Sequence, residues 1–513
     1  MRRKQSTAVL AVLIIVGAAL GCTQPEAAFP TTAATTAAAA TAAVVPTAAP
    51  EPTIAPAALP VLSLGAGDTY FNIDGKQSFI TVRNITGKTQ ADFDTLLEWA
   101  HTGGTRLVRV HLTHGWWGQA WIYKDWSLNE KWAEDWDGFF EQAGADGIYV
   151  MPVFGVWADW NSGKPDWGSS DWKYNPLNMA NINFVDKGPL TSPGGLFESG
   201  SDTQKHWLAW VEALVKRWEG RDNIAAWEIF SEVNIATGAP GNQDAKGGVS
   251  EAAGEALTER AMAVIEAADT RHRPVTLSLA GVYSTTDQWA KYYRLDSLDF
   301  IEIHPYHDEL DRELVKEVKD YQTRYQKPVM IGESGLWSMN YKPNAVVAIR
   351  HAIWAGLVSG AMNGRGLWWN DGYAIYEIDD RTAAMKYMNG YADAELPVVK
   401  FTEGMDFADF KPLESSSSNG IWGAVVGNQK SVIGWFRDAG SEPPYWSVRP
   451  VLSGEGVTIS MPSAAGNWQV DFYDTKTGTI LPGSVSVTGN GSRVSIPLPD
   501  FTDDIAFKAR LQE

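Results

Sequence analysis

Short apolar runs alternate with longer amphipathic segments between about residues 66 and 400. The runs are rich in β-branched residues, as in buried parallel strands, and the segments between them, such as ADFDTLLEWAHTGG, carry apolar residues at helical spacing. Eight repeats over ~330 residues are typical of a (β/α)8 TIM barrel, an α/β fold. The alternative is an open doubly wound sheet, but no glycine-rich nucleotide fingerprint follows the first strand. The predicted strands are 79–85, 107–112, 148–154, 225–230, 275–279, 300–304, 329–331 and 366–369.

The pattern changes after residue 400. Helical periodicity stops, and short alternating runs such as WGAVVG, SVIGWF and WQVDFYDT are separated by Gly, Asn, Ser and Pro. This texture predicts a small all-β sandwich domain over 401–513, behind a barrel domain over 63–400.

The N-terminus has the pattern of an export signal. Three basic residues precede 14 uncharged, mostly apolar residues, which is short of the ~20 that a membrane-spanning helix needs. The only cysteine, Cys22, follows this run and resembles the lipidated cysteine of a bacterial lipobox, although Ala19 stands where leucine is usual. We expect a lipoprotein-type signal peptide over 1–22, and a tether over the Ala/Thr/Pro-rich segment 23–62. The alternative is an ordinary secretory signal with a passive Cys22.

Composition narrows the class of protein. Of the 513 residues, 44% are hydrophobic and 20% are charged, as in globular proteins, and one cysteine permits no intramolecular disulfide. The net charge of −19 argues against nucleic acid as a partner, because phosphate binding needs a basic patch. We expect an extracellular or cell-surface monomer, attached to the membrane only through its lipid anchor.

Candidate chemistry lies at the ends of the predicted strands, where barrel enzymes place their catalytic groups. The fourth strand ends in AAWEIFSEVN, with Glu228 and Glu232, and the seventh ends in PVMIGESG, with Glu333. Two carboxylates that face each other across a barrel mouth are what glycoside hydrolysis requires. Glu228 is expected to point into the barrel or to pair with a basic residue, and Glu302, on the sixth strand, to be structural.

These motifs resemble those of clan A glycoside hydrolases, most similarly the family 5 cellulase and mannanase group. The resemblance covers about residues 66–400 and implies a retaining double displacement on a β-linked polysaccharide or oligosaccharide, without a cofactor. WEIFSE places the acid/base at Glu232, and IGESG places the nucleophile at Glu333. The implied substrate-binding positions are Arg109 in RLVRVHL, His304 and Tyr306 in HPY, and Trp368 or Trp369 in GLWWN.

Two neighbouring positions extend this site. His111 lies two residues beyond Arg109, so strand alternation puts both side chains on one face. Ser231 stands where the family usually has the asparagine that binds the sugar 2-hydroxyl. Asn234 or a water replaces that contact, or the substituent at carbon 2 differs. Ser231 also motivates the alternative of a carbohydrate-binding lipoprotein with weak or lost catalysis. A transporter's solute-binding protein is disfavoured, because the sequence shows no two symmetric α/β lobes.

Tryptophan is concentrated in one stretch, since ten of the 24 fall between residues 116 and 172. Trp132 and Trp136 are four residues apart, which predicts the buried face of a helix. Trp157, Trp160, Trp167 and Trp172 lie among Asp and Asn, the mixture that a sugar cleft uses. We expect at least three of the tryptophans in this stretch to line the cleft, with packing as the alternative for any one of them. His304 and His307 lack a third ligand at a convincing spacing, so no metal site is predicted. The last domain resembles modules that follow bacterial glycosidase barrels, and its few tryptophans favour bracing over sugar binding.

Overall fold

The described part of the chain forms one compact unit. Residues from Pro56 onward belong to this unit, and Met1–Ala55, with the predicted signal and Cys22, lies outside the described residues. Within the described residues no helix combines the length and the apolarity that a membrane crossing requires. The computed structural model describes residues 59–85, 90–113, 120–123, 125–160, 172, 175–177, 193–236, 251–280, 290–335, 345–367, 394–443, 446–447, 449–460 and 465–512.

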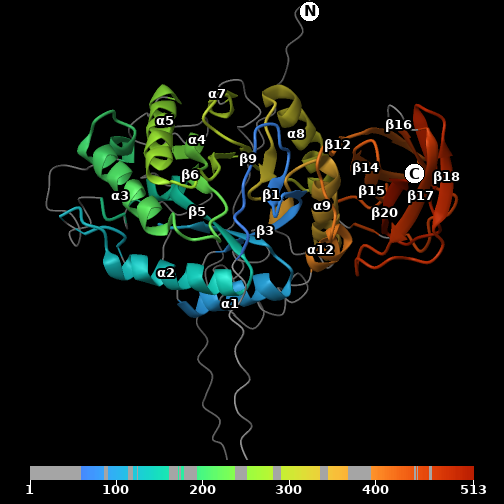
Figure 1. The fold of residues 1–513 in the computed structure, drawn as a ribbon, viewed down its shortest axis with the longest axis horizontal. Helices are drawn as coiled ribbons and strands as arrows, with labels where there is room; N and C mark the ends of the chain where they lie inside the picture. The colour runs from blue at the N-terminus through green and yellow to red at the C-terminus, as the bar shows by residue number, and fades with distance from the viewer. Residues whose placement is uncertain are drawn as a thin grey trace, which may run out of the picture. The chain divides into compact units, whose positions relative to one another are not determined.

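Parallel strands with helices around them form the barrel of the first domain (Figure 1). Hydrogen-bonded pairs run in the orders β11-β3-β4-β5-β6-β7 and β10-β9-β8. Leu277 links β7 to β8. At the other break, the amide of Met362, the residue before β11, donates to the carbonyl of Val329 in β10 at 2.9 Å. The predicted (β/α)8 fold is confirmed, with every expected strand present. The strands are β3 (Ile80–Ile85), β4 (Leu107–His111), β5 (Tyr149–Val156), β6 (Trp227–Ser231), β7 (Val275–Thr276), β8 (Ser278–Ala280), β9 (Ile301–His304), β10 (Val329–Ile331) and β11 (Asn363–Leu367).

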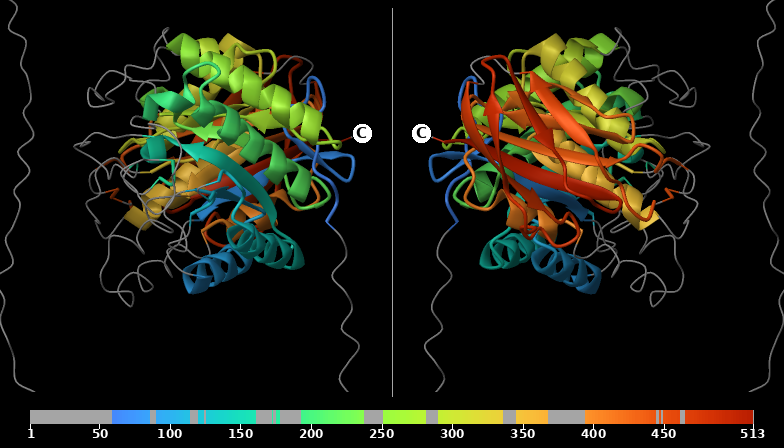
Figure 2. Two further views of the ribbon diagram at one scale, coloured as in Figure 1. Left: turned by 90° about the vertical axis from the view of Figure 1, so that its left-hand side faces the viewer. Right: turned by 90° about the vertical axis from the view of Figure 1, so that its right-hand side faces the viewer.

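Helices follow the strands and cover the outside of the barrel (Figure 2). Two of them begin at side-chain caps: the Asn129 side chain accepts from the Trp132 amide at 3.3 Å, and Ser201 accepts from the Gln204 amide at 3.0 Å. The helices are α1 (Gln90–Thr102), α2 (Glu130–Ala145), α3 (Asp202–Trp218), α4 (Val233–Ala236), α5 (Glu251–Ala268), α7 (Ala290–Tyr293), α8 (Leu310–Tyr325) and α9 (Ala345–Ser359), with short 3₁₀ turns η2 (Trp157–Trp160) and η4 (Pro193–Leu196).

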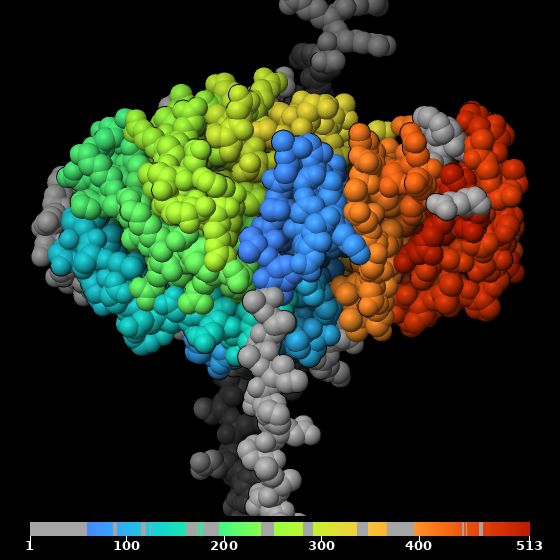
Figure 3. Space-filling view, in the orientation of Figure 1, coloured from blue at the N-terminus to red at the C-terminus, as the bar shows by residue number. Residues whose placement is uncertain are grey.

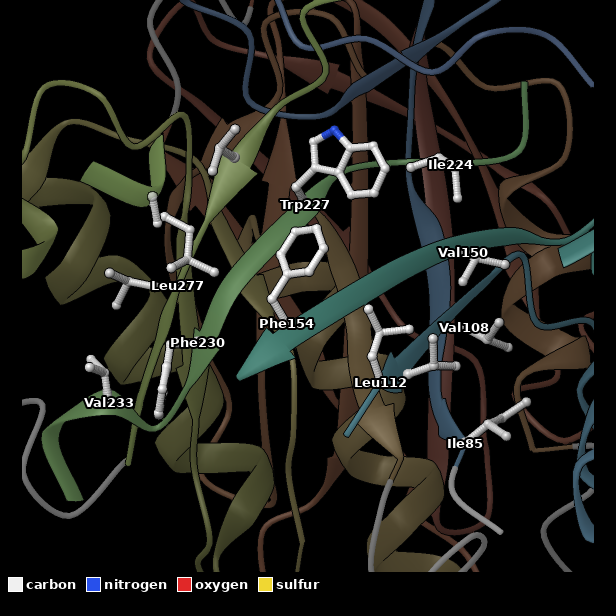
Figure 4. Close-up of a cluster of buried hydrophobic side chains, with 14 of the residues drawn as sticks. Ile85, Val108, Leu112, Val150, Phe154, Ile224, Trp227, Phe230, Val233 and Leu277 are labelled. Atoms are coloured by element: carbon white, nitrogen blue, oxygen red, sulfur yellow. The ribbon is translucent and has the colours of Figure 1, made fainter. Parts of the chain in front are cut away.

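Large aromatic side chains fill the layer between strands and helices. Phe154 on β5 stacks on Trp227 of β6, with ring centroids 5.7 Å apart, in the cluster shown in Figure 4. Trp132 and Trp136 are fully buried on the inner face of α2, as their spacing predicts. Burying indoles in this layer contributes strongly to the core, so most of the described tryptophans serve packing.

An N-terminal hairpin, absent from the sequence prediction, closes the amino-terminal end of the barrel. Its strands β1 (Phe71–Ile73) and β2 (Lys76–Ser78) pair antiparallel, and Figure 3 shows this segment in blue on the face toward the viewer. Phe71 meets Phe300 edge-on at 5.7 Å, and buried Leu62 joins the same apolar cluster. The Tyr149 hydroxyl donates to the Pro60 carbonyl at 2.6 Å. The packed chain therefore begins before the expected end of the tether at residue 62.

The C-terminal domain is the predicted all-β sandwich, and its strands face the viewer in the right-hand view of Figure 2. All its strand pairs are antiparallel, and an apolar core lies between its two sheets. The larger sheet holds β12 (Lys411–Pro412), β14 (Ile421–Gly427), β15 (Ser431–Asp438), β20 (Asp504–Leu511), β17 (Gly466–Tyr473) and β18 (Val485–Gly489), and the smaller holds β13 (Glu414–Ser417), β16 (Gly456–Ser460) and β19 (Arg493–Pro497).

The second face of the larger sheet packs against α9 and α12 (Leu396–Thr402) of the barrel. The Trp354 indole donates to the Thr475 carbonyl at 3.1 Å, and Phe401 meets Tyr473 edge-on at 4.8 Å. Helix α12 continues across the expected domain boundary at residue 400. If the sandwich braces the barrel, we would expect such apolar and hydrogen-bonded contacts between the larger sheet and the barrel helices α9 and α12.

Candidate active site

Ionisable side chains converge at the carboxyl ends of the barrel strands. Glu232 follows β6, His304 ends β9 and Glu333 follows β10, while Arg109 projects from β4. A parallel bridge between Tyr306 and Gly335 continues the β9–β10 pairing and brings the tyrosine beside Glu333. The barrel thus gathers residues that are far apart in the sequence.

Glu333 is held as a carboxylate by two donors. Its Oε1 accepts from Arg109 Nη1 at 2.6 Å, and its Oε2 accepts from the Tyr306 hydroxyl at 2.8 Å. His111 lies on the same face as Arg109, as predicted, with Nε2 3.8 Å from Oε1 of Glu333. Burial alone would raise the pKa of Glu333, but the charges of His304 and Arg109 and these hydrogen bonds outweigh it, so its pKa lies below the usual value.

Glu232 has the opposite electrostatic environment. Burial is the largest effect and raises its pKa, the charge of Glu333 adds to this, and a contact with His304 Nδ1 at 2.9 Å only partly opposes it. The backbone of Glu232 is left-handed, with φ of 56°, which is unusual for a residue with a side chain. The Ser278 hydroxyl accepts its amide hydrogen at 3.1 Å and so helps to hold this conformation.

Three further polar side chains support the central residues. Glu228 pairs with Arg109 through both oxygens, at 2.6 and 2.7 Å, as expected of it. Ser278 donates to Glu228 at 2.9 Å, and Asn84 accepts from Arg109 at 2.9 Å. Burial raises the pKa of Glu228 to about 7, against the opposing charge of Arg109. Sequence reasoning missed Asn84 and Ser278, although each is a polar residue inside a predicted apolar strand.

His304 lies between carboxylates. One oxygen of Glu232, one of Glu333 and a ring nitrogen of His304 lie within 4.8 Å of one another. Burial lowers the pKa of His304, but Glu333, Glu232 and Glu302 outweigh it and raise the pKa to about 10. A protonated imidazole has no lone pair for a metal. The cluster therefore fits acid–base chemistry better than metal binding.

Several predicted positions lie elsewhere. Trp160 and Trp172, candidates for stacking on sugar, are instead buried against each other, with centroids 5.8 Å apart, so neither offers a face to a ligand. Trp157 is half-buried in η2 and packs against the same core. Trp167, Trp368 and Trp369 lie outside the described residues.

Ser231 is buried at the end of β6, directly before Glu232. Asn234 is fully buried, and its side-chain oxygen accepts from the Ala280 amide at 2.9 Å. Asn234 therefore fixes α4 to β8 through its side-chain oxygen.

Solved structures with a similar fold are glycoside hydrolases. One described as "Glycoside hydrolase" is 12% identical, with a TM-score of 0.56, and the match covers 88% of this chain and 97% of its own. A glycoside hydrolase of family 5 from Bacteroides vulgatus is also 12% identical, with a TM-score of 0.56, and 88% and 93% are covered. Neither a protein-family model nor a curated protein sequence matches the chain. At this identity the likeness establishes the TIM-barrel fold alone.

Proposed function

We propose that this protein is a retaining glycoside hydrolase that cleaves a β-linked polysaccharide or oligosaccharide. The observation that carries the proposal is the pair Glu232 and Glu333, two carboxyl groups at one barrel mouth whose pKa values are displaced in opposite directions. A glycosidase needs one carboxyl group protonated and the other charged at the same pH. The similar fold of known glycoside hydrolases supports the same conclusion.

In the first step the charged Glu333 attacks the anomeric carbon of the sugar. The bond from that carbon to the leaving oxygen breaks as a covalent glycosyl ester forms on Glu333. Glu232 gives its proton to the leaving oxygen, so the departing group leaves as a neutral alcohol. Arg109 and Tyr306 keep Glu333 charged and fix its orientation through their hydrogen bonds.

In the second step Glu232, now ionised, removes a proton from a water molecule. The hydroxide character of that water lets it attack the anomeric carbon from the face that the alcohol left. The ester bond breaks, Glu333 regains its charge and Glu232 regains its proton. Each step inverts the anomeric carbon once, so the product retains the β configuration.

The spacing of the carboxyl groups supports retention. Retaining enzymes separate these groups by ~5–5.5 Å, and inverting enzymes by ~6.5–9.5 Å to fit a water between them. The oxygens of Glu232 and Glu333 that approach each other lie within 4.8 Å. This close approach is compatible with the retaining separation and suits direct attack by Glu333.

Release of reducing ends from a panel of β-linked polysaccharides tests the proposal. Glu333→Gln should lower kcat by at least about 10³-fold, because an amide cannot attack the sugar, while the melting midpoint stays close to that of the wild type. Glu317→Gln is the matched control, since Glu317 is a largely buried carboxyl group on the outer helix α8 with a pKa raised to about 7. Activity retained in the Glu333 variant would refute the assignment.

Proton NMR of the first-formed product tests the stereochemistry. A β-linked substrate should give the β anomer first, followed by slow mutarotation. The α anomer as first product would contradict the double displacement while leaving hydrolysis itself intact.

Ser231 favours one second candidate, a carbohydrate-binding lipoprotein with weak or lost catalysis. A serine hydroxyl is shorter than the asparagine amide usual in the family that the sequence resembles. The same panel separates the two functions: a binding protein would be retained on an insoluble glycan and release no reducing ends.

We also propose that the chain is exported and held to a membrane through a lipid on Cys22. The support is the signal-like run that ends at the only cysteine, followed by the Ala/Thr/Pro-rich segment. Cys22→Ser should move the protein from the membrane fraction to the soluble one. Unchanged fractionation would overturn the anchor.

A further inference from the structure

One buried carboxylate beside the site has no part in the mechanism above. Glu302 lies on β9, two residues before His304, and its side chain is fully buried. Its Oε1 lies 2.8 Å from Arg109 Nε and 3.6 Å from His304 Nε2. One carboxylate oxygen therefore lies between the two cationic side chains that contact the catalytic pair.

The fold makes room for this carboxylate at a specific position. A Cβ on Gly332 would come within 1.7 Å of Oε1 of Glu302, so only glycine fits before the nucleophile. The Tyr293 hydroxyl also donates to the Glu302 backbone carbonyl at 2.7 Å, which fixes the strand at this residue. The placement is built by residues on three elements, β9, α7 and the end of β10.

We propose that Glu302 is a positioning residue that keeps the His304 imidazole doubly protonated, so that its Nδ1–H continues to donate to the acid/base Glu232. This inference rests on the function proposed above. The contacts form a chain in which Glu302 faces Nε2 of His304 and Glu232 faces Nδ1. The other groups that face the imidazole are Glu333, with Oε2 at 3.6 Å from Nδ1, the charge of Arg109, and Glu228 behind that arginine.

The need for Glu302 follows from the charge of Arg109. Two cations held this close repel each other, and Arg109 lowers the pKa of His304 while the facing carboxylates raise it. During the covalent intermediate Glu333 is an uncharged ester and Glu232 is ionised, so the carboxylates that face His304 are Glu232 at Nδ1 and Glu302 at Nε2. Glu302 then remains to hold the second proton on His304, at the stage when the ionised Glu232 needs a donor.

Nuclear magnetic resonance tests the first consequence without any activity measurement. The full chain, labelled with ¹⁵N at its eight histidines, is titrated, and the His304 signal is identified by its loss in His304→Gln. The wild-type signal should stay that of an imidazolium to a pH of about 10. In Glu302→Gln the pKa of His304 should fall by about 1–2 units, which is the effect of removing one charge at this distance. An unshifted His304 signal would overturn the proposal.

Two variants keep this test decisive. Glu302→Asp retains the charge but withdraws it by one carbon, so its His304 pKa should lie between those of the wild type and Glu302→Gln. If Glu302→Gln does not fold, the aspartate variant decides alone: an intermediate value supports the proposal and an unshifted one overturns it. Glu317→Gln, which removes a largely buried carboxyl group from the outer helix α8, should leave the signal unchanged.

Kinetics test the second consequence. In Glu302→Gln kcat should fall about ten-fold above the lowered pKa of His304, while kcat/KM falls less, because the second chemical step is the one affected. A purely structural role would reduce kcat and kcat/KM by the same factor and leave the pH profile unchanged, which would refute the positioning role. If the wild type hydrolyses no glycan, the proposed function fails, and the titration still reports on Glu302.

Discussion

Replacing Asp504 by asparagine tests how strongly the sandwich is bonded to the barrel. Asp504 accepts from the Trp435 indole at 3.0 Å and from the Thr475 hydroxyl at 2.7 Å, and Arg350 of α9 lies 3.3 Å away. The carboxylate is fully buried, and the arginine side chain is only 12% exposed. An asparagine side chain would keep the shape of the aspartate but remove its charge, and would leave Arg350 with Asp503 alone.

The expected loss follows from breaking a buried ion pair. Removing one partner of such a pair costs about 3–5 kcal/mol, because the other charge stays buried with less compensation. We therefore expect Asp504→Asn to lower the free energy of unfolding by about 3 kcal/mol or more in urea at pH 7. Asp471→Asn on β17 is the control: its partner Arg510 lies 3.9 Å away and is 54% exposed, so the loss should stay below about 1 kcal/mol.

The same variant has a predictable pH dependence. Burial raises the pKa of Asp504, but the charges of Arg350 and His351 and its hydrogen bonds outweigh this, and its pKa lies below the usual value. A carboxyl group whose pKa is lower in the folded than in the unfolded state stabilises the protein at pH values above its unfolded-state pKa of about 3.9. This stabilisation is lost as the pH falls through the folded-state pKa. The difference between wild type and variant should be full at pH 6–7 and shrink below about pH 4. A difference below about 1 kcal/mol at pH 7 would refute the reasoning.

Two further changes probe the site and the helices. Tyr306→Phe removes the 2.8 Å hydrogen bond to Glu333, so the pKa of Glu333 should rise. The acidic limb of the kcat/KM profile should then move to higher pH, by about one unit for each 1.4 kcal/mol of stabilisation lost. An unmoved limb would contradict the role given to the hydroxyl. Gly332→Ala should reduce activity strongly, because the new Cβ collides with Glu302. Gly138→Ala is the contrasting variant, since a Cβ at this position of α2 meets nothing within 4 Å. It should stabilise the helix by about 1 kcal/mol and so raise the melting midpoint. If Gly332→Ala and Gly138→Ala changed activity and melting midpoint equally, the collision between the new Cβ and Glu302 would have no energetic cost.

The barrel could be predicted because its strands are buried on both faces. Such strands appear as short continuous apolar runs, and each of the eight expected runs coincides with a strand within a few residues. The hairpin of β1 and β2 was missed because its strands have three residues each and little pattern. In β20 the apolar residues Ile505, Phe507, Ala509 and Leu511 face the core of the sandwich, and Lys508 and Arg510 alternate with them on the opposite face. Lys508 is nevertheless buried, with its ammonium 4.6 Å from the Phe401 ring.

The site was predictable only in part, because its residues come together through the closure of the barrel. Local motifs single out Glu232 and Glu333, whereas Arg109 and Tyr306, which the resemblance implies as substrate-binding positions, both donate to Glu333. Spacing in one strand cannot show that Glu302 of β9 lies against Arg109 of β4, since that contact depends on the register of the whole barrel. For Trp160 and Trp172 the alternative of packing holds, and the sequence could not decide this because acidic neighbours do not reveal which way an indole points.

The site holds more carboxyl groups than the proposed mechanism uses. Four carboxyl groups surround the two cations Arg109 and His304, so two protons on the carboxyl groups would balance the charge of the cluster. The two with raised pKa values are Glu228 and Glu232. One of these protons would belong to Glu232, the acid of the proposed mechanism, and the other to Glu228, a partner of Arg109. Removing Glu228 or Glu302 would change how many protons the cluster holds, and with it the protonation of Glu232 and Glu333.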